Sequence, residues 1–320
     1  MMVLVTGANG FIGRALCSMI MLKGWQIRGT VRDVSSLPEG VDAVKIKSIN
    51  IDTNWASALK GVDVVVHLAA RVHVMEKKDP DPIAAFREVN VIGTERLART
   101  AAVAGVKRFV FLSSIGVNGS MTHRLPLSEK DGPQPHNPYA LSKLEAEQVL
   151  RRIASESGME LVVIRSPLVY GPGNPGNILR LLSLVDKGWP LPLASVTNSR
   201  SLIYLGNLVD AIMTCITHPD AAGKTFLVSD SQDISTSKLL RLLASAMGKK
   251  PRLIPFPLAL LKVIGTLLGK SDEIQRLTGS LLIDSSRIRN VLGWKPPFSM
   301  EEGIRETVKW YKNSTRSVRY

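Results

Sequence analysis

Short apolar runs and longer segments of helical periodicity alternate along the first half of this chain. The runs are rich in β-branched residues and are expected to form strands at 3–5, 26–31, 62–70, 108–112 and 161–165. The segments between them place apolar residues three and four positions apart, which predicts helices at about 11–23, 83–104 and 139–155. Apolar strands that alternate with helices are typical of a doubly wound parallel sheet in an α/β protein.

The composition shifts near Pro172 toward Pro, Gly and Leu, which predicts a boundary between two lobes. Residues 1–171 would form the domain that contains the sheet, and residues 172–320 a smaller C-terminal α/β lobe. Beyond the boundary the last third is largely helical. The chain there is expected to form a strand, a second strand that can rejoin the first sheet, and a terminal helix, at 201–205, 224–229 and 300–311.

A glycine-rich turn, T-G-A-N-G-F-I-G, occupies positions 6–13 between the first strand and the first helix. Gly7 permits the tight turn, Gly10 lets backbone amides approach a pyrophosphate, and Gly13 allows the helix to pack closely on the strand. The unpaired amides and the dipole of a helix N-terminus favour such an anion. We therefore predict a Rossmann-type dinucleotide site with contacts from Gly7, Asn9, Gly10, Phe11, Ile12 and Gly13.

The end of the second strand bears on which dinucleotide is bound. In this fold an acidic residue there binds the ribose hydroxyl of NAD, whereas an Arg accommodates the 2′-phosphate of NADP. The strand ends at Val31, and Arg32 and Asp33 follow it. Arg32, with Arg14 as a second cation, favours NADP(H). Asp33 keeps NAD as an alternative, and a third interpretation is a pair of solvated charges.

Tyr139 and Lys143 are four residues apart in a predicted helix and therefore share one of its faces. A free Tyr titrates near about 10, and an ammonium beside it would lower the pKa of the phenol, which would then serve as a general acid or base. Taken alone, so short a pattern fits two solvated side chains at least as well.

Two hydroxyl side chains, Ser113 and Ser114, follow the strand at 108–112. They would lie at the carboxyl edge of the sheet, where ligands bind in open α/β folds. Neither has the flanking glycines of a nucleophile elbow, so a hydrogen-bonding role is left for them. His67 falls inside a predicted strand and is interpreted as structural.

The formal net charge of +14 favours anionic partners, which include nucleic acid, anionic lipid and phosphate-bearing small molecules. The basic residues are scattered and only 5% of residues are aromatic, which argues against a nucleic-acid surface. Cys17 and Cys215 suit no metal spacing and are interpreted as reduced, buried thiols. No secretory leader precedes the first strand, so we expect a cytoplasmic protein. Because the cysteines suit no metal spacing, we also expect no metal site.

One C-terminal segment, 253–268, is almost wholly apolar but contains Pro255, Pro257 and Lys262. It is too broken to span a bilayer, so no stable membrane insertion is expected. The interpretation that we favour is a buried or amphipathic helix of the C-terminal lobe. The alternative is loose contact with a membrane surface.

Six motifs follow one another at the spacing of a known superfamily: the glycine turn, His67–Ala70, Asn90 with Gly93-Thr94, Ser113-Ser114, Tyr139 with Lys143, and 165–173. In this combination the chain resembles the extended short-chain dehydrogenase/reductases over nearly its whole length. The spacing G-x-x-G-x-x-G is that superfamily's own pattern. The resemblance implies a catalytic group of Ser114, Tyr139 and Lys143, and a homodimer formed by the helices at 83–104 and 139–155.

The resemblance also assigns residues to the two ligands. Cofactor contacts are implied for Arg32, Ser48, Ile49, Leu68, Ala69, Ala70, Asn90, Tyr139, Lys143, Pro167 and Val169, and Ser48 stands where the family has an adenine-binding Asp. Substrate contacts are implied for Ser113, Ser114, Asn177, Arg200 and Arg276. The two arginines are similar to residues that bind the diphosphate of a nucleotide sugar.

Within the superfamily, 70–75 and 228–230 resemble bacterial polysaccharide-cluster enzymes. These are often labelled UDP-glucose 4-epimerases, and some are 4-keto reductases that make UDP-N-acetylquinovosamine. Epimerases have an acid at the end of the second strand, where this chain has Val31-Arg32. We therefore expect an NADPH-dependent reductase of a UDP-linked 4-keto-6-deoxy sugar in lipopolysaccharide or O-antigen synthesis. The alternatives are an NAD-dependent UDP-hexose 4-epimerase and a non-catalytic NADP-binding or nucleic-acid-binding relative.

Overall fold

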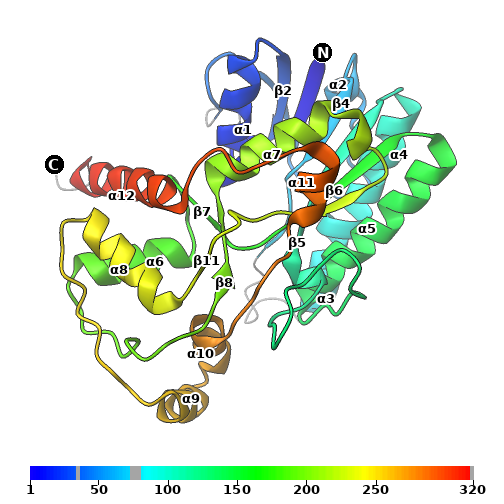
Figure 1. Cartoon of the computed structure of the whole chain (residues 1–320). Helices are drawn as coiled ribbons and strands as arrows, with labels where there is room; N and C mark the ends of the chain where they lie inside the picture. The colour runs from blue at the N-terminus through cyan, green and yellow to red at the C-terminus, as the bar shows by residue number, and fades with distance from the viewer. Residues whose placement is uncertain (34–36, 73–80, 318–320) are drawn as a thin grey trace.

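A seven-stranded sheet lies at the centre of the fold, in the order β10-β6-β5-β4-β1-β2-β3 (Figure 1). The structure is a computed structural model that describes residues 1–33, 37–72 and 81–317. Every neighbouring pair in this sheet is parallel, which confirms the predicted α/β class. The strands are β1 Met2–Thr6, β2 Gln26–Val31, β3 Asp42–Lys45, β4 Val64–His67, β5 Arg108–Ser114, β6 Glu160–Ser166 and β10 Thr225–Leu227.

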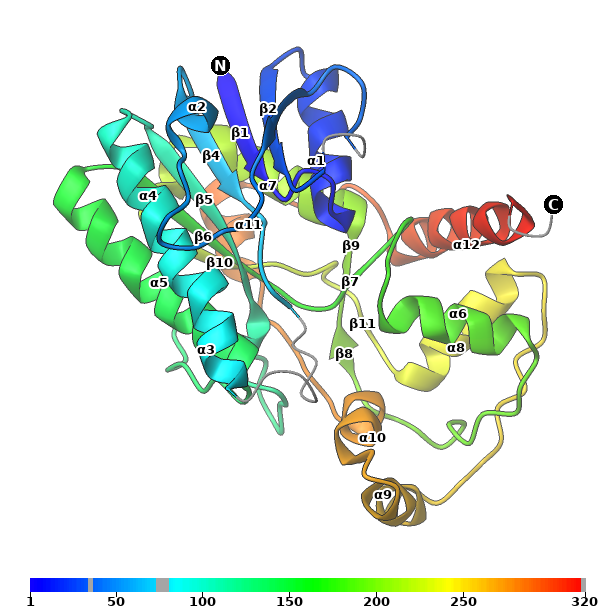
Figure 2. The same cartoon turned by 180° about the vertical axis from the view of Figure 1, so that it is seen from behind.

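The two faces of the sheet bury alternate residues of each strand, as a side-chain period of two requires. Val3 and Val5 of β1 pack in one hydrophobic cluster with Leu16, whereas Leu4 packs in a second cluster with Leu97. Figures 1 and 2 show the helices that cover the two faces. They are α1 (Phe11–Leu22), α7 (Leu205–Thr217) and α11 (Ser286–Leu292) on one side, and α2 (Ala56–Leu59), α4 (Gly93–Val103) and α5 (Pro138–Ser157) on the other.

The C-terminal part of the chain adds a helical lobe with two small strand pairs. β7 (Val169–Tyr170) pairs with β9 (Ile203–Tyr204), and β8 (Arg200–Ser201) pairs with β11 (Asp233–Ile234). The helices are α6 Asn177–Asp186, α8 Thr236–Ala246, α9 Leu258–Leu267, α10 Ser271–Thr278 and α12 Met300–Ser317, with a short turn η4 at Pro219–Ala221. Another short turn, η3 at Ile115–Val117, directly follows β5 of the main sheet. The lobe shares a hydrophobic cluster with the sheet, and we keep the division at 171/172 as a proposal.

Several predicted elements differ from the structure. The strand expected at 201–205 is interrupted at Leu202, because β8 and β9 pair with different partners and Leu205 already begins α7. The helix expected at 83–104 is α3 (Pro82–Arg87), a π-helical turn η2 (Glu88–Ile92) and α4 in succession. The strand at 224–229 does rejoin the first sheet, as β10 beside β6.

The apolar segment at 253–268 contains α9, which is not a buried helix. Its buried residues are Leu261 and Gly265, while most of its other residues are exposed. Among the described residues, no helix is both long enough and apolar enough to cross a bilayer. Cys17 and Cys215 are buried free thiols, as predicted, and burial raises the pKa of each to about 12. Residues 73–75 of the motif quoted at 70–75 lie outside the described residues.

We predict that Gly13→Ala destabilises the fold. A Cβ at this position would lie 2.1 Å from the Gly7 carbonyl oxygen and 2.9 Å from the Ala8 Cα, so α1 would have to move away from β1. We expect a loss of about 1–3 kcal/mol or more in the free energy of unfolding, measured in urea. The control is Gly132→Ala, because nothing lies within 4 Å of a Cβ there. Equal losses in the two variants would contradict the close packing of α1 on the glycine turn.

Candidate active site

The carboxyl ends of the central strands meet at one edge of the sheet. The register pairs Thr6, the last residue of β1, with His67 at the end of β4, and it pairs Ser114 with Ser166 at the ends of β5 and β6. From β1 the chain continues to β2 and β3 and then crosses to the opposite side of β1 to form β4. Ligands of open parallel sheets bind in the crevice at such a reversal. The turn after β1 and the segment after β4 therefore frame the candidate cofactor site.

The glycine turn has the geometry that its sequence predicts. Gly7 has a φ of 68°, and a Cβ there would lie 3.1 Å from the Ala69 nitrogen, so the turn passes close to the end of β4. Gly10 is the N-cap of α1, which has no side-chain cap and no acidic residue in its first turn. The amides at this N-terminus are thus not occupied by a carboxylate, which fits an anionic pyrophosphate. Arg14 supports the turn through a 2.9 Å bond from its Nε to the Asn9 carbonyl.

A buried chain of hydrogen bonds lies behind this turn and was not predicted. The Thr6 hydroxyl accepts bonds from the amides of Leu68 and Ala69, both at 3.2 Å, and lies 2.7 Å from His67 Nδ1. His67 Nε2 lies 2.9 Å from the Thr94 hydroxyl. Burial lowers the pKa of His67 to about 3, so the ring is neutral. His67 therefore has the structural role that was predicted, and it ties the end of β4 to β1 and α4.

Asn90 positions the loop after β4 and was predicted to contact the cofactor. Its side-chain oxygen accepts a 2.8 Å bond from the Arg71 amide, and its Nδ2 donates to the Arg71 carbonyl and to the Ser142 hydroxyl, both at 3.0 Å. Both donors of the amide are used in these bonds, and the residue is buried. Asn90 therefore supports the backbone that follows Ala70, and its contact with the cofactor stays a prediction.

The other residues predicted to contact the cofactor line the same edge. Leu68, Ala69 and Ala70 directly follow β4, and Pro167 and Val169 follow β6. Arg32 and Ser48 are exposed, beyond the ends of β2 and β3. Ile49 packs against the helix at Gly93, where a Cβ would lie 2.4 Å from Ile49 Cγ2. Gly93 and Thr94 thus each have a structural reason. The absence of a side chain at Gly93 lets Ile49 pack against the helix, and the Thr94 hydroxyl is hydrogen-bonded to His67.

Ser114 and Tyr139 come from two elements that are packed together at Gly116. The Ser114 Oγ accepts a 3.1 Å bond from the Gly116 amide, which leaves its proton for a ligand. Tyr139 is in the first turn of α5, which Asn137 caps through a 2.8 Å bond from the Ala140 amide. A Cβ on Gly116 would lie 3.3 Å from Ser114 Oγ and 3.2 Å from Ala140 Cβ. The structure therefore brings the predicted catalytic hydroxyl and the predicted catalytic helix together.

Lys143 lies one turn further along α5, inside the protein. It is 3% exposed, its Nζ donates a 2.8 Å bond to the Leu112 carbonyl, and it lies 4.3 Å from the centre of the Phe111 ring. Burial lowers the pKa of Lys143 to about 7, although the charge of Glu147 acts in the opposite direction. The Lys143 side chain thus contacts the backbone near the carboxyl end of β5, and it comes from the same helix as Tyr139.

The pKa of Tyr139 differs from the prediction. The sequence predicts a pKa lowered by Lys143, but burial raises the pKa of Tyr139 to about 12. The physical reason is that the Lys143 ammonium is bound to the Leu112 carbonyl, while the Tyr139 ring packs edge-on against Phe86 at 6.1 Å between ring centres. The phenol is therefore protonated at neutral pH.

Ser113 does not face the candidate site. Consecutive residues of a strand point to opposite faces, and the Ser113 hydroxyl donates a 2.6 Å bond to the buried carboxylate of Glu147. Arg165 holds the same carboxylate through two bonds, of 2.9 Å from Nε and 2.6 Å from Nη2. We therefore correct the predicted substrate contact of Ser113. Glu147 and Arg165 form a buried ion pair behind Lys143 that the sequence motifs did not reveal.

Two cations mark the end of the site that was predicted to bind a diphosphate. Arg200 on β8 donates a 3.1 Å bond to the Gly279 carbonyl. The pKa of Arg200 is lowered first by burial and then by the charge of Arg276. His136, which was not predicted, lies near Gly116, where a Cβ would lie 3.4 Å from its Cε1, and its pKa is lowered first by burial and also by the charge of Arg276. Asn177 is exposed at the start of α6.

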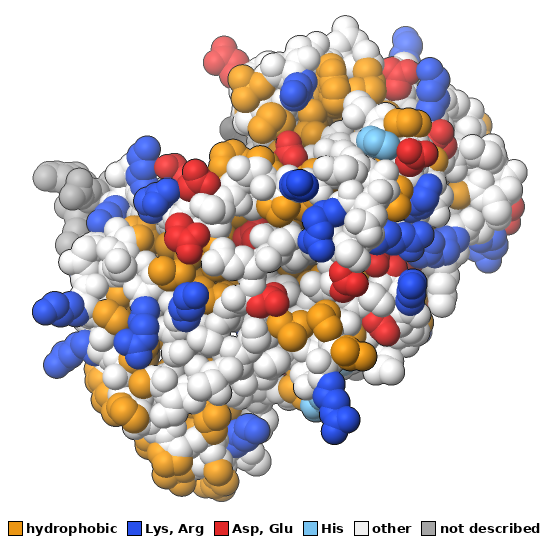
Figure 3. Space-filling view, viewed as in Figure 1, with side chains coloured by type: hydrophobic (Ala, Val, Ile, Leu, Met, Phe, Trp, Pro, Cys, Tyr) orange, Lys and Arg blue, Asp and Glu red, His pale blue; other side chains and the backbone are white. Residues whose placement is uncertain are grey.

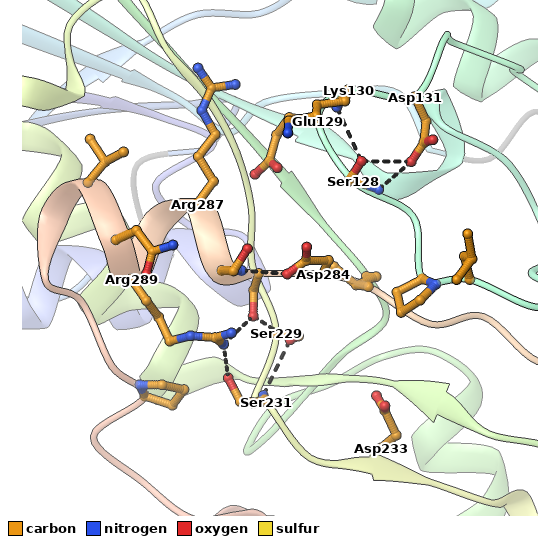
Figure 4. Close-up of a pocket in the computed structure, with 18 of the residues that line it drawn as sticks. Ser128, Glu129, Lys130, Asp131, Ser229, Ser231, Asp233, Asp284, Arg287 and Arg289 are labelled. Atoms are coloured by element: carbon orange, nitrogen blue, oxygen red, sulfur yellow. Dashed lines mark hydrogen bonds between the residues drawn. The ribbon is translucent and has the colours of Figure 1, made fainter.

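A separate pocket of about 1340 Å³ is shown in Figure 4. It is lined by residues of the loop at 125–131, the segment after β10 and helix α11, and none of the predicted site residues lines it. Arg289 donates hydrogen bonds to Ser231 and Ser285. The pocket lining also contains the basic residues Lys130 and Arg287 together with the acidic residues Glu129, Asp131 and Asp284. The opposed charges favour no particular class of ligand.

The parallel sheet, the glycine turn and the Ser-Tyr-Lys group define an enzyme of the short-chain dehydrogenase/reductase type. A sequence model of the NAD dependent epimerase/dehydratase family matches residues 3–229. The chain belongs to this family, as its resemblance to the extended short-chain dehydrogenase/reductases predicted.

Similar proteins cover almost the whole chain. A UDP-glucose 4-epimerase of Vibrio cholerae is 45% identical over 310 residues, which are 96% of this chain and 94% of that protein. An N-acetyl-alpha-D-glucosaminyl-diphospho-ditrans,octacis-undecaprenol 4-epimerase of Escherichia coli O157:H7 is 27% identical over 326 residues, with coverage of 96% and 94%. The solved structure of MoeE5 in complex with UDP-glucose and NAD matches with a TM-score of 0.79, 27% identity and coverage of 98% and 100%.

The buried Lys143 predicts a pH-dependent stability. Its pKa falls from 10.5 to about 7 on folding, so between these values the unfolded chain binds more protons and stability rises with pH. We expect Lys143→Met to be more stable than the native protein at pH 6, by about 2 kcal/mol, because a buried cation is removed. The difference should shrink as the pH rises from 7 toward 10.5.

Urea unfolding at several pH values measures this difference. The exposed Lys309→Met is the control and should stay within about 0.5 kcal/mol of the native protein. A Lys143→Met variant whose advantage grows with pH would have the wrong sign for a buried amine with a lowered pKa.

Proposed function

We propose that this protein is an NAD-dependent 4-epimerase of a hexose linked to UDP. The observation that carries this proposal is the 45% identity to the Vibrio cholerae UDP-glucose 4-epimerase, which extends over 96% of this chain and includes the C-terminal lobe. The reductase that we expected from the sequence has less support from the comparisons than this alternative. The arrangement of Ser114, Tyr139 and Lys143 is compatible with both reactions.

The site residues have distinct tasks in an epimerase. A bound nicotinamide dinucleotide supplies a hydride acceptor and donor for C4 of the sugar. Tyr139 removes the proton of the C4 hydroxyl when the hydride leaves, and it returns the proton to the same oxygen when the hydride comes back to the other face. Ser114 donates a hydrogen bond to that oxygen, because its own Oγ is oriented by the Gly116 amide. Lys143 places a cation behind the end of β5, on the same helix as Tyr139.

The arginine pair binds the anionic part of the substrate in this proposal. Arg200 and Arg276 are close enough to depress the pKa of Arg200, and a diphosphate between them would relieve their repulsion. The Escherichia coli relative is named for a sugar linked through a diphosphate to undecaprenol rather than to uridine. A sugar diphosphate is the group that both substrate types share, and UDP is the carrier that we propose.

The reductase remains the second candidate function, and one observation favours it. Arg32 follows β2 where the NAD-dependent epimerases have an acid, and its side chain is exposed at the cofactor edge. In a reductase NADPH would deliver a hydride to the C4 carbonyl of a 4-keto sugar, and Tyr139 would donate its proton once. The raised pKa of Tyr139 suits such a donor.

Two features of the expected setting remain proposals. We infer that two copies pair through α4 and α5, as the resemblance implies, and light scattering measures this. We also propose a cytoplasmic location and a role in surface polysaccharide synthesis, where UDP-linked sugars are consumed.

The epimerase proposal predicts a large effect of Tyr139→Phe. With UDP-glucose as substrate, we expect kcat for formation of UDP-galactose to fall by about 10²–10⁴-fold, because the proton acceptor is lost. Tyr311→Phe makes the same chemical change on α12 and should leave kcat within about twofold. If Tyr139→Phe retained full activity, the catalytic role of this residue would be wrong.

The cofactor preference is tested at Arg32. We expect Arg32→Ala to weaken the binding of NADP⁺ by about tenfold or more, because a charge-assisted bond to the 2′-phosphate is lost, while binding of NAD⁺ stays within about twofold. Titration calorimetry measures both, with Lys23→Ala as an exposed control. An enzyme that consumes NADPH with a 4-keto sugar and never interconverts UDP-glucose and UDP-galactose would establish the reductase instead.

A further inference from the structure

Helix α9 presents a regular apolar stripe to solvent. Leu260, Val263, Ile264 and Leu267 recur at positions i, i+3, i+4 and i+7, so their side chains share one face of the helix. They are 48%, 54%, 38% and 80% exposed, and Leu268 and Ile254 beside them are 66% and 48% exposed. This spacing is the one that helices use for a buried face. A stripe of this kind in solvent indicates a binding surface.

The packing of α9 within the chain does not cover this stripe. The buried residues of α9, Leu261 and Gly265, lie on a flank of the helix beside the stripe. Gly265 lets α10 approach, because a Cβ there would lie 2.6 Å from Cγ1 of Ile274. Figures 1 and 2 place α9 at the lower end of the molecule, beyond α10, and Figure 3 shows hydrophobic side chains gathered at that end. The exposed face is thus a projecting apolar surface rather than a groove.

The charge around the stripe is mainly basic. Between residues 249 and 276 the sequence contains six basic residues, and its two acidic residues, Asp272 and Glu273, lie in the first turn of α10. Lys250, Arg252, Lys262 and Lys270 are exposed, and Lys249 pairs with Asp186. Trp189 is 61% exposed and follows Gly188, whose carbonyl accepts a 3.4 Å bond from Arg252. An apolar stripe bordered by cations and an exposed Trp is typical of a helix that lies in the interface of an anionic bilayer.

A second copy of the chain fits this surface less well. A two-fold contact between two α9 helices would bring two sets of mainly basic side chains together, with Asp272 and Glu273 of α10 as the acids beside them. Anionic lipid headgroups instead neutralise these cations while the apolar side chains enter the acyl boundary. We propose that α9 docks the protein on the surface of an anionic lipid bilayer, with the stripe Leu260–Leu267 as the inserted face. The helix lies on the membrane and does not cross it.

The location of α9 gives this contact a consequence for the site. α9 packs on α10, which carries Arg276, the cation close to Arg200. Docking therefore holds the diphosphate end of the candidate site near the bilayer. The docking itself goes beyond the proposed epimerase function and does not depend on it, because the surface is built by residues outside the catalytic group.

Vesicle sedimentation of the full-length protein tests the proposal. Vesicles of phosphatidylglycerol and phosphatidylcholine in equal parts are compared with vesicles of phosphatidylcholine alone. We expect the protein to partition onto the anionic vesicles at least about tenfold more strongly, since each cation near an anionic surface contributes about fivefold. High salt should weaken the binding because it screens these charges.

Two matched variants assign the binding to α9. Leu267→Glu and Leu22→Glu each place a carboxylate at the last residue of a helix, at side chains that are 80% and 81% exposed. We expect Leu267→Glu to lose about tenfold or more in vesicle partitioning and Leu22→Glu to change it less than about twofold. Thermal unfolding of both variants should match the native protein, which shows that they are folded.

Three results would overturn the proposal. The first is native protein that does not sediment with anionic vesicles. The second is an equal loss of vesicle binding in Leu267→Glu and Leu22→Glu, which would place the contact elsewhere. The third is native protein that binds no vesicle but forms an oligomer in light scattering that Leu267→Glu dissociates, because a second copy would then be the partner of the stripe.

Discussion

The parallel register of the sheet is the constraint on which the site depends. It aligns the last residues of β1, β4, β5 and β6 at one edge, so that a glycine turn, a small-residue loop and a serine distant in the chain become neighbours. The approach of α1 to β1, possible only because Gly13 lacks a side chain, keeps the helix N-terminus at that edge. The site is therefore a consequence of strand pairing more than of any single motif.

Behind this edge the protein keeps charged groups away from water. Lys143 is held by the Leu112 carbonyl, and the Glu147–Arg165 pair lies behind it. Removing a cation from water is unfavourable, so burial destabilises the charged form of Lys143 and lowers its pKa. A residue that reduces stability at neutral pH and still lies on the predicted catalytic helix is consistent with a functional role. The raised pKa of Tyr139 has the same origin, since this half-buried side chain is also removed from water.

Much of this architecture could be predicted from the sequence, and the failures have physical reasons. The strands, the glycine turn and the α5 helix follow from local patterns, whereas the grouping of Ser114 with α5 was implied by the family resemblance. The role of Ser113 could not be read from its motif, because strand alternation turns it toward Glu147, a partner 34 residues away. The hydrogen bonds of Asn90 and Lys143 to the backbone of Arg71 and Leu112 could not be predicted, because no side-chain pattern reveals a backbone partner. The exposure of α9 depends on what packs against it, which composition alone does not determine.

The central claim is that one site removes the C4 hydrogen of a UDP-hexose and returns it to the opposite face. The most direct test uses UDP-glucose with deuterium at C4, incubated with the purified protein without added dinucleotide and followed by NMR. The account predicts UDP-galactose that retains the deuterium at C4, because the label never leaves the site. Galactose without the label, or the absence of UDP-galactose together with NADPH consumption on a 4-keto sugar, would contradict it.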